Sequence, residues 1–448
     1  MTDPKVLSKE DINQFKSNFE TNDKNLFAQN VVHEHGPQTA CLNPKAKLAI
    51  SDNVFSHTID DMSPGTNQQS SGRCWIFAGL NAMRLPLKKN KKLTEFEFSQ
   101  NYLFFWHKIE TSNNFLHTIY KIYKDSPNEK PEGRLLSTLL CNPCSDGGNW
   151  KCFSNLVAKY GVMPKECFPD NDSCKFSYAM NDILKSKLQQ FAFELSKVVE
   201  VMTEEEIETR IKAYMNTIYQ IVGICLGIPP DTFTWRFKDE DKNQQKIGPI
   251  TPLEFYNDHV KPHFNVSTKV HLSADPRPFM LVGQTYKNEY AGKMLGAEDD
   301  CILNVEMGTV MKIASKSIQE GEAVIFSGYF REFKHDKYLD TDLFNYKLVF
   351  DTDVFTSMTK ANRITFSNDF PNHMALLTGV DIDETTEKPL KWRVENSSWD
   401  QYLTMTNAWF EEFGFGIIVD QSHCSQEILD GFKTTPIILP FWNGLASC

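Results

Sequence analysis

The pattern of apolar and polar positions divides the chain into a helical first half and a strand-rich last third. From Cys74 to about residue 160 the pattern is mostly helical. In residues 148–161, for example, apolar side chains recur every three or four positions from Trp150 to Val157, and Gly161 is a suitable helix end. Such a segment predicts a helix with one face buried against the rest of the protein.

A strongly helical region is predicted between Cys174 and Leu226. Thr203 and Glu206 have the spacing of a capping box, in which each side chain bonds the backbone of the other at a helix start. The helix that follows is predicted to bury one apolar face, made of Ile207, Ile211, Tyr214, Ile218, Ile221 and Cys225. Thr251 and Pro252 predict the cap and first turn of a further helix.

After about residue 320 the pattern changes to short apolar or alternating runs bounded by polar residues, which predict strands. These runs cover residues 321–330, 373–382, 389–396 and 415–420. A helix-rich half followed by a strand-rich third indicates an α+β fold, and the two parts are expected to meet at a cleft.

The composition narrows the class of protein. The chain has 448 residues, of which 41% are hydrophobic and 23% are charged, as in soluble globular proteins with two or three domains. The net charge of −11 argues against a strongly basic nucleic-acid-binding surface. No segment resembles a signal peptide or a membrane span. Eleven cysteines without a secretion signal predict reduced thiols in the cytosol.

Cys74 is the first candidate for chemistry. It follows a turn-like approach, Ser70–Gly72, and precedes the apolar run Trp75–Leu80, which predicts a buried helix. A cysteine at a helix N-terminus lies at the positive end of the helix dipole, which favours the thiolate. The stretch therefore predicts a nucleophile, although a cysteine taken alone is equally typical of a core.

A nucleophilic cysteine needs a base, and the base needs a group that orients it. His373 begins the predicted strand 373–382, where the strand fixes a side chain that faces a cleft. Asn396 lies just past another predicted strand and can hold the tautomer of an imidazole by accepting a hydrogen bond. Trp399 is placed to shield that bond from water. Taken singly, His373 and Asn396 are ordinary strand-end and turn residues, and the Cys74 motif selects them.

These residues follow the order found in papain-like cysteine peptidases. Along the chain the order is Gln68, Cys74-Trp75, Asn372-His373 and Asn396-Ser397. Longer segments resemble the bleomycin hydrolases, the cytosolic branch also called aminopeptidase C. The segments are NQQSSGRCWIFAGLNAMR, SDGGNWKCFSNLVAKYGVMPKECFP, DPRP, GEAVIFSG, NHMALLTGV, KWRVENS and PIILPFW. The resemblance covers nearly the whole chain, in the same order.

The resemblance implies a cysteine aminopeptidase of broad specificity. Cys74 would be the nucleophile, His373 the base and later the acid, and Asn396 the orienting residue. The reaction would pass through an acyl-enzyme, with peptides or small amides of the bleomycin type as substrates and no metal or organic cofactor. The family also forms cytoplasmic homohexamers, in which the active sites face a central channel.

The same resemblance implies roles for further residues of this chain. The Gln68 amide and the Cys74 backbone N–H would bind the oxyanion that forms during attack. Gly147 and Gly148 resemble the glycine wall that pairs with an extended substrate backbone. Glycine suits this role because a second backbone can approach it closely.

The spacing predicts a large insertion. About 300 residues separate Cys74 from His373, whereas papain-type enzymes need only about 130–150. The expected fold is a papain-like two-lobe core with a helical or hook-like insertion. Its parts are an arm (1–60), a helical lobe with the nucleophile (61–164), the inserted region (165–292), a β-rich lobe (293–435) and a C-terminal arm in the active site (436–448).

Two departures from the family pattern stand out. The usual Asn-Ser-Trp-Gly is replaced by Asn396-Ser397-Ser398-Trp399-Asp400, so Trp399 is expected to sit differently over the Asn396–His373 bond. The family's terminal carboxylate marks where the substrate's amino group binds. Here the usual Asp-Pro-Met-Gly-Ala-Leu-Ala tail is replaced by residues 443–448, so that this carboxylate belongs to Cys448 unless the residue is trimmed. Five apolar residues are expected to anchor the arm: Ile437, Ile438, Leu439, Phe441 and Trp442.

Two alternatives to the interpretation as a metal-free peptidase remain open. Cys141 and Cys144 have the spacing of a zinc-ligand pair, but the cysteines that follow are irregularly spaced, which favours reduced thiols over a metal site. The second alternative is a hexameric scaffold or nucleic-acid-binding protein of the same fold with weakened catalysis. The altered loop after Asn396 favours it, whereas the complete set of Gln68, Cys74 and His373, and the negative net charge, oppose it.

Overall fold

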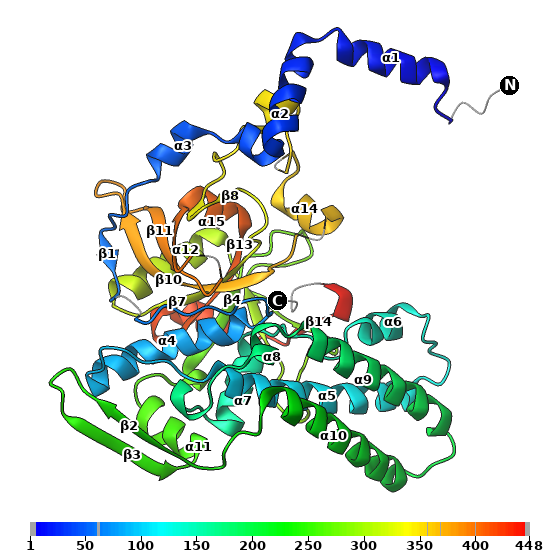
Figure 1. Ribbon diagram of the computed structural model, residues 1–448, viewed down its shortest axis with the longest axis vertical. Coiled ribbons are helices and arrows are strands. Elements are labelled where there is room, and N and C mark those ends of the chain that lie inside the picture. The colour runs from blue at the N-terminus through cyan, green and yellow to red at the C-terminus, as the bar shows by residue number, and fades with distance from the viewer. Residues whose placement is uncertain (1–5, 61–62, 356, 368, 399, 444–448) are drawn as a thin grey trace.

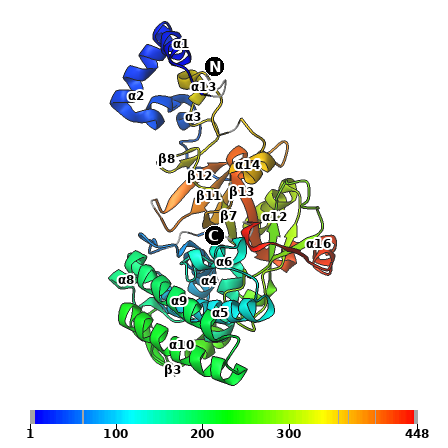
Figure 2. The ribbon, with the colours of Figure 1, turned by 90° about the vertical axis from the view of Figure 1, so that its right-hand side faces the viewer.

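The computed structural model describes residues 6–60, 63–355, 357–367, 369–398 and 400–443. Figure 1 shows a strand-rich part above a helical part, with an N-terminal arm projecting from the strand-rich part. Figure 2 shows the same arm pointing away from the helices. Trp399 and Cys448, two of the candidate site residues, lie outside the described residues.

The arm and the helical part are built from α-helices and one hairpin. The arm contains α1 (Lys9–Glu20), α2 (Asp23–Cys41), α3 (Pro44–Ala49) and the short strand β1 (His57–Thr58). The helical part contains α4 (Cys74–Lys91), α5 (Gln100–Asp125), α6 (Arg134–Cys141), α7 (Trp150–Tyr160), α8 (Asp172–Lys175), α9 (Tyr178–Val198), α10 (Glu204–Leu226) and α11 (Pro252–Phe255), with the hairpin β2 (Phe233–Lys238) and β3 (Gln244–Ile250). Short helical turns are η1 (Lys165–Cys167), η2 (Tyr256–Val260) and η3 (Val266–Thr268).

The strand-rich part contains one mainly antiparallel sheet. In spatial order its strands are β14 (Ile437–Leu439), β5 (Thr285–Asn288), β6 (Ile302–Asn304), β4 (Lys269–Ser273), β13 (Gly414–Asp420), β7 (Val324–Gly328), β10 (His373–Ile382), β11 (Pro389–Glu395), β12 (Tyr402–Thr406), β9 (Tyr338–Leu339) and β8 (Lys334–His335), and β1 pairs with β10. The helices and turns of this part are α12 (Met307–Gln319), α13 (Tyr346–Phe350), α14 (Lys360–Ser367), α15 (Asn407–Phe413), α16 (Gln426–Gly431), η4 (Gln421–His423) and η5 (Phe441–Asn443). The four strands predicted after residue 320 are confirmed as β7, β10, β11 and β13.

Most local predictions in the helical half are also confirmed. Cys74 begins α4, and every residue from Trp75 to Leu80 is buried. The capping box of α10 forms at Thr203 as expected, and Thr251 caps α11 with Pro252 in its first turn, also as expected. Gly161 ends α7 at a φ of 73°, and a Cβ there would lie 2.1 Å from the carbonyl oxygen of Pro252, so that only glycine fits.

Two local predictions are wrong. The last turns of α10 bury Val222 and Leu226 rather than Ile221 and Cys225. The buried face rotates because α10 contacts α5 and α9 along its length and also α8. The stretch from Lys165 to Gly292 is mainly helical up to Leu226, and beyond it the strands β2, β3, β4 and β5 alternate with only short helical elements.

Helix α4 lies between the two parts. It packs against β10 and β7 on one side and against α5 and α7 on the other. The side chains of β10 point alternately into two cores. Met374 and Leu376 belong to the core around α4, whereas Ala375 and Leu377 belong to the core of the sheet. The N-terminus of α4 and the start of β10 are therefore fixed by a shared core. No described helix combines the length and apolar character that a membrane crossing requires.

Candidate active site

Cys74 and His373 meet where α4 packs on β10. Cys74 is 5% exposed and His373 is 6% exposed. The backbone N–H groups of Met374, the neighbour of His373, and of Trp75 lie near the Cys74 sulfur and favour its ionised form. The sequence separates the two candidate residues widely, and the fold brings them together.

His373 is paired with Asn396. Its Nε2 lies 2.7 Å from Oδ1 of Asn396, and the pair is buried. The Asn396 amide is itself oriented, because its Nδ2 donates to the carbonyl of Asp400 at 3.1 Å and its backbone N–H donates to the carbonyl of Gln401 at 2.8 Å. Since Oδ1 is the acceptor, His373 Nε2 carries the proton in this pair and Nδ1 is the basic nitrogen.

The segment before His373 is also held in place. The Asn372 side chain accepts from the N–H of Phe330 at 2.8 Å, and the Asn372 N–H donates to the carbonyl of Gly328 at 3.0 Å. The Phe330 ring meets the imidazole edge to face, with centroids 5.0 Å apart. These contacts fix the ring of His373 from the side of β7.

Burial sets the protonation states of the candidate pair. It raises the pKa of the Cys74 thiol, although nearby backbone N–H groups oppose the change. The N–H groups at the start of α4 favour the thiolate, as expected, but desolvation outweighs them in the resting site. Burial also lowers the pKa of His373 to about 4, so that the imidazole is neutral at pH 7 and able to accept a proton.

Gln68 is tied to the loop that carries Asn396. Its Oε1 accepts from the hydroxyl of Ser397 at 2.9 Å, and its backbone N–H donates to the carbonyl of Ser397 at 2.6 Å. Its Nε2 donates to the carbonyl of Ser71 at 2.6 Å. Because an amide nitrogen carries two N–H donors, Nε2 of Gln68 has a second donor besides the one bonded to Ser71. Gln68 is thus buried and oriented beside the turn that leads to Cys74.

Gly147 and Gly148 lie in the loop between α6 and α7, beside the approach to Cys74. Gly148 is buried, and a Cβ there would lie 2.7 Å from the indole of Trp75. The glycine is therefore required by packing on Trp75, independently of any substrate. Gly147 is half-buried.

The sequence analysis missed Asp146, which joins this loop to the nucleophile turn. Its carboxylate accepts hydrogen bonds from the Gly72 N–H and from three side chains, Lys108 (2.7 Å), Ser177 (2.5 Å) and Asn181 (2.8 Å). These contacts hold its pKa well below its usual range, although burial opposes them. No local pattern marks Asp146, because its partners lie in other segments of the chain.

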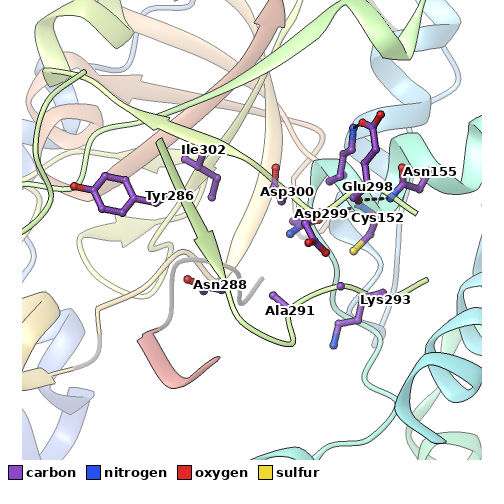
Figure 3. Close-up of a pocket in the computed structure, with 13 residues that line it drawn as sticks. Cys152, Asn155, Tyr286, Asn288, Ala291, Lys293, Glu298, Asp299, Asp300 and Ile302 are labelled. Atoms are coloured by element: carbon purple, nitrogen blue, oxygen red, sulfur yellow. Dashed lines mark hydrogen bonds and ion pairs between the residues drawn. The ribbon is translucent and has the colours of Figure 1, made fainter. Parts of the chain in front are cut away.

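A separate pocket lies between α7 and residues 286–302 (Figure 3). It contains the buried thiol of Cys152, whose pKa is raised to about 11 by burial. None of the described residues that line this pocket is a histidine. Cys152 thus has no histidine base among the described residues of the pocket, which leaves Cys74 as the better nucleophile.

The described cysteines show no metal site. Each cysteine in the part of the chain that the structure covers is a free thiol. Within that part, no three histidine, cysteine, aspartate or glutamate side chains gather as metal ligands. The zinc alternative at Cys141 and Cys144 therefore gains no support.

The C-terminal arm reaches the helical part of the site. Strand β14 pairs in parallel with β5, and Asn443 accepts a hydrogen bond from the Arg277 guanidinium at 2.8 Å. The prediction that five apolar residues anchor the arm is wrong in detail: Leu439 is buried, Phe441 packs on the core, but Ile438 is 60% exposed. Strand pairing and the Arg277 bond supply the remaining attachment.

Comparisons with known proteins agree with this arrangement. The model of the Peptidase C1-like family matches residues 6–446. Bleomycin hydrolase of Homo sapiens is 41% identical over 433 residues, which cover 94% of each chain. A Saccharomyces cerevisiae protein named cysteine proteinase 1, mitochondrial, is 35% identical over 97% of this chain and 92% of its own.

The crystal structure of PepW from Lactobacillus rhamnosis HN001 has the same fold. It superposes with a TM-score of 0.94 at 30% sequence identity and covers 99% of this chain and 100% of its own. The expected α+β, papain-like fold is confirmed, as is the resemblance on which the sequence analysis relied. The chain therefore belongs to the Peptidase C1-like family, as a cysteine aminopeptidase of the bleomycin hydrolase type.

Proposed function

We propose that Cys74 is the nucleophile, His373 the general base and acid, and Asn396 the residue that orients His373. The Cys74 sulfur attacks the carbonyl carbon of the scissile bond, and its proton passes to Nδ1 of His373. The same proton then goes to the leaving amine as the C–N bond breaks, which leaves an acyl-enzyme. His373 next removes a proton from the water that hydrolyses the thioester.

The observation that carries this proposal is the buried His373–Asn396 pair beside the Cys74 sulfur. E-64, an epoxide that alkylates nucleophilic thiols, tests it directly. One equivalent is expected to label Cys74 at neutral pH and to abolish hydrolysis. Absence of labelling, with the fold intact, would favour the scaffold alternative.

Gln68 is proposed to bind the developing oxyanion together with the Cys74 N–H. Replacing Gln68 with alanine is expected to lower kcat by about 10²–10³-fold, because a transition-state donor is lost. Steady-state kinetics on an aminoacyl fluorogenic amide measure the change. KM is expected to change little.

Gln69 provides the matched control. It is exposed and has a φ of 53°, which asparagine tolerates. Gln69→Asn should retain activity. An equal loss in both variants would mean that the turn, and not the Gln68 amide, was damaged.

We propose that the C-terminal arm makes the enzyme an aminopeptidase. An aminopeptidase must block one side of its cleft and receive the substrate's ammonium group. Attachment of the arm through β14 and Arg277 supports this role, since it brings the chain end toward the site. The terminal carboxylate would attract a free α-amino group, and Gly147 and Gly148 would pair with the substrate backbone.

Deleting residues 443–448 is expected to convert the enzyme toward endopeptidase action. The full-length enzyme should prefer a free-amine peptide over its N-acetylated form by about 10²-fold or more, the size of one charged contact in a partly desolvated cleft. The truncated enzyme should lose that preference. Similar cleavage of both peptides by the full-length enzyme, or an unchanged preference after truncation, would contradict the role of the tail.

The substrates are proposed to be peptides with a free amino terminus, with broad side-chain specificity, and small amides. Bleomycin is included because the relatives are named bleomycin hydrolases. The acyl-enzyme route needs no metal or organic cofactor, because Cys74 and His373 supply the nucleophile and the proton transfers.

The enzyme is further proposed to be a cytoplasmic homohexamer. Helix α1 supports self-association, because Ile12, Phe15 and Phe19 lie on one face and remain largely exposed in a single chain. The net charge of −11 makes nucleic acid an improbable partner.

A further inference from the structure

A carboxyl group is buried behind the candidate active site. Glu395 is the last residue of β11 and is 1% exposed. Both of its carboxyl oxygens accept from the side-chain Nδ2 of Asn81, at 3.0 and 3.1 Å. A buried acid is costly, and none of the catalytic roles proposed above uses it.

A cation is buried close to this carboxyl group. Arg84 on α4 is 0% exposed, and its Nη1 donates to the carbonyls of Pro64 and Phe96 at 3.0 and 3.3 Å. Among the described residues, no hydrogen-bond partner is found for its Nε and Nη2. Arg84 and Glu395 attract each other through space, without a direct hydrogen bond.

The cluster joins three segments that carry candidate site residues. Asn81 lies two turns beyond Cys74 on α4. The hydroxyl of Thr66, two positions before Gln68, accepts from Asn81 at 2.9 Å and also favours the ionised form of Glu395. Glu395 itself directly precedes Asn396.

We propose that Glu395 is a positioning residue whose carboxylate holds the Asn396 end of β11 against α4, and thereby fixes His373 relative to Cys74. The proposal rests on the roles assigned to these residues above and adds to them a pH-dependent control of alignment. Glu395 does not touch the reacting atoms. It acts through Asn396 and through the packing of α4.

The groups that face Glu395 determine how readily its carboxyl group ionises. From α4, the Asn81 amide and the Arg84 cation favour the ionised form, and so does the Thr66 hydroxyl. The carboxyl of Glu97 opposes it, and Tyr402 on β12 faces Arg84. Burial opposes ionisation most strongly, so that the pKa of Glu395 is raised to about 7.

Only the ionised carboxyl attracts Arg84, and so alignment improves as the pH rises through about 7. His373 titrates separately, with a pKa near 4. We therefore expect kcat to fall in two distinct steps as the pH is lowered. The lower one reflects loss of the base, and the upper one reflects loosening of the β11–α4 contact.

The test is the pH profile of kcat, from pH 3.5 to 9, for the full-length enzyme and Glu395→Gln. The parent enzyme should lose about three- to tenfold in kcat on passing below pH 7, with KM nearly constant, and should lose the remainder near pH 4. Glu395→Gln keeps the shape and one acceptor for Asn81 but cannot ionise. It should stay at the lower plateau from pH 5 to 9 and keep only the step near pH 4.

A merely structural role would lower thermal stability without removing the upper step. Glu97→Gln is the matched control, because Glu97 also faces Arg84 but pairs with Lys165 at 2.7 Å on a segment without a candidate site residue. It should keep both steps. The rate of Cys74 alkylation by iodoacetamide should show the same pH steps as kcat.

Thr66→Val provides a second measurement should Glu395→Gln fail to fold. It removes a hydroxyl that favours the carboxylate, and so the upper step should move to higher pH. A parent profile that is flat between pH 5.5 and 8.5, or an upper step that persists in Glu395→Gln, would overturn the proposal. Such results with E-64 labelling intact would leave the roles of Cys74 and His373 standing, whereas absent labelling would remove both.

Discussion

Replacing Cys74 with alanine is expected to lower kcat for an aminoacyl fluorogenic amide by about a millionfold, to the level that binding alone supports. The change removes the thiol that lies beside the backbone N–H of Met374, next to the buried His373–Asn396 pair. It removes little packing volume, since the side chain is small and lies at the start of α4. The thermal midpoint and the oligomer mass should remain those of the parent enzyme.

Cys152→Ala is the matched control for this experiment. Cys152 is equally a buried thiol, but it lies in the pocket of Figure 3 without a histidine among the described lining residues. It should retain activity within a few fold and should still react once with E-64. Turnover by purified Cys74→Ala above a trace of the parent rate would rule out Cys74 as the nucleophile.

Replacing His373 with alanine is expected to be nearly as damaging, with a loss of about 10⁴-fold or more in kcat, because no base remains to take the thiol proton. Asn396→Ala should lose only about 10–100-fold, the usual effect of removing a group that orients a histidine. The ring of His373 would still be held by Phe330. Single-turnover and steady-state measurements at pH 7.5 compare the two variants.

His57→Ala is the control for His373→Ala, because it removes another histidine of the same sheet. His57 is exposed on β1 and pairs with Val380 on the same strand that begins at His373. Its replacement should leave kcat unchanged. If Asn396→Ala proved as inactive as His373→Ala, the interpretation of Asn396 as an aid to orientation would be wrong.

The sequence predicted those features whose cause is local. The cap of α10 requires only Thr203 and Glu206, three positions apart. The strand β10 is predicted by a continuous apolar run. Cys74 at a helix start was predictable for the same reason. The hairpin β2–β3 also carried a local signal that was overlooked, since Phe233, Trp235 and Phe237 alternate with polar residues.

The remaining features depend on contacts that a single segment does not reveal. Glu395 meets Asn81 across 314 residues, and Ser397 meets Gln68 across 329. The rise in the pKa of Cys74 could not be predicted, because the helix dipole is a local property, whereas burial depends on the whole fold. The same holds for Asp146, whose partners come from the nucleophile turn and from α5 and α9.

The attachment of the C-terminal arm has a consequence for how this enzyme can change during evolution. The pairing of β14 with β5 and the bond from Arg277 to Asn443 all lie before residue 444. Trimming beyond Asn443 therefore leaves these contacts of the arm in place. If the chain end bounds the cleft as proposed above, each residue gained or lost beyond Asn443 would change how much peptide fits between the chain end and Cys74. Selection could thus shift the register of cleavage, from one residue at a time to dipeptides, by altering only the last few codons.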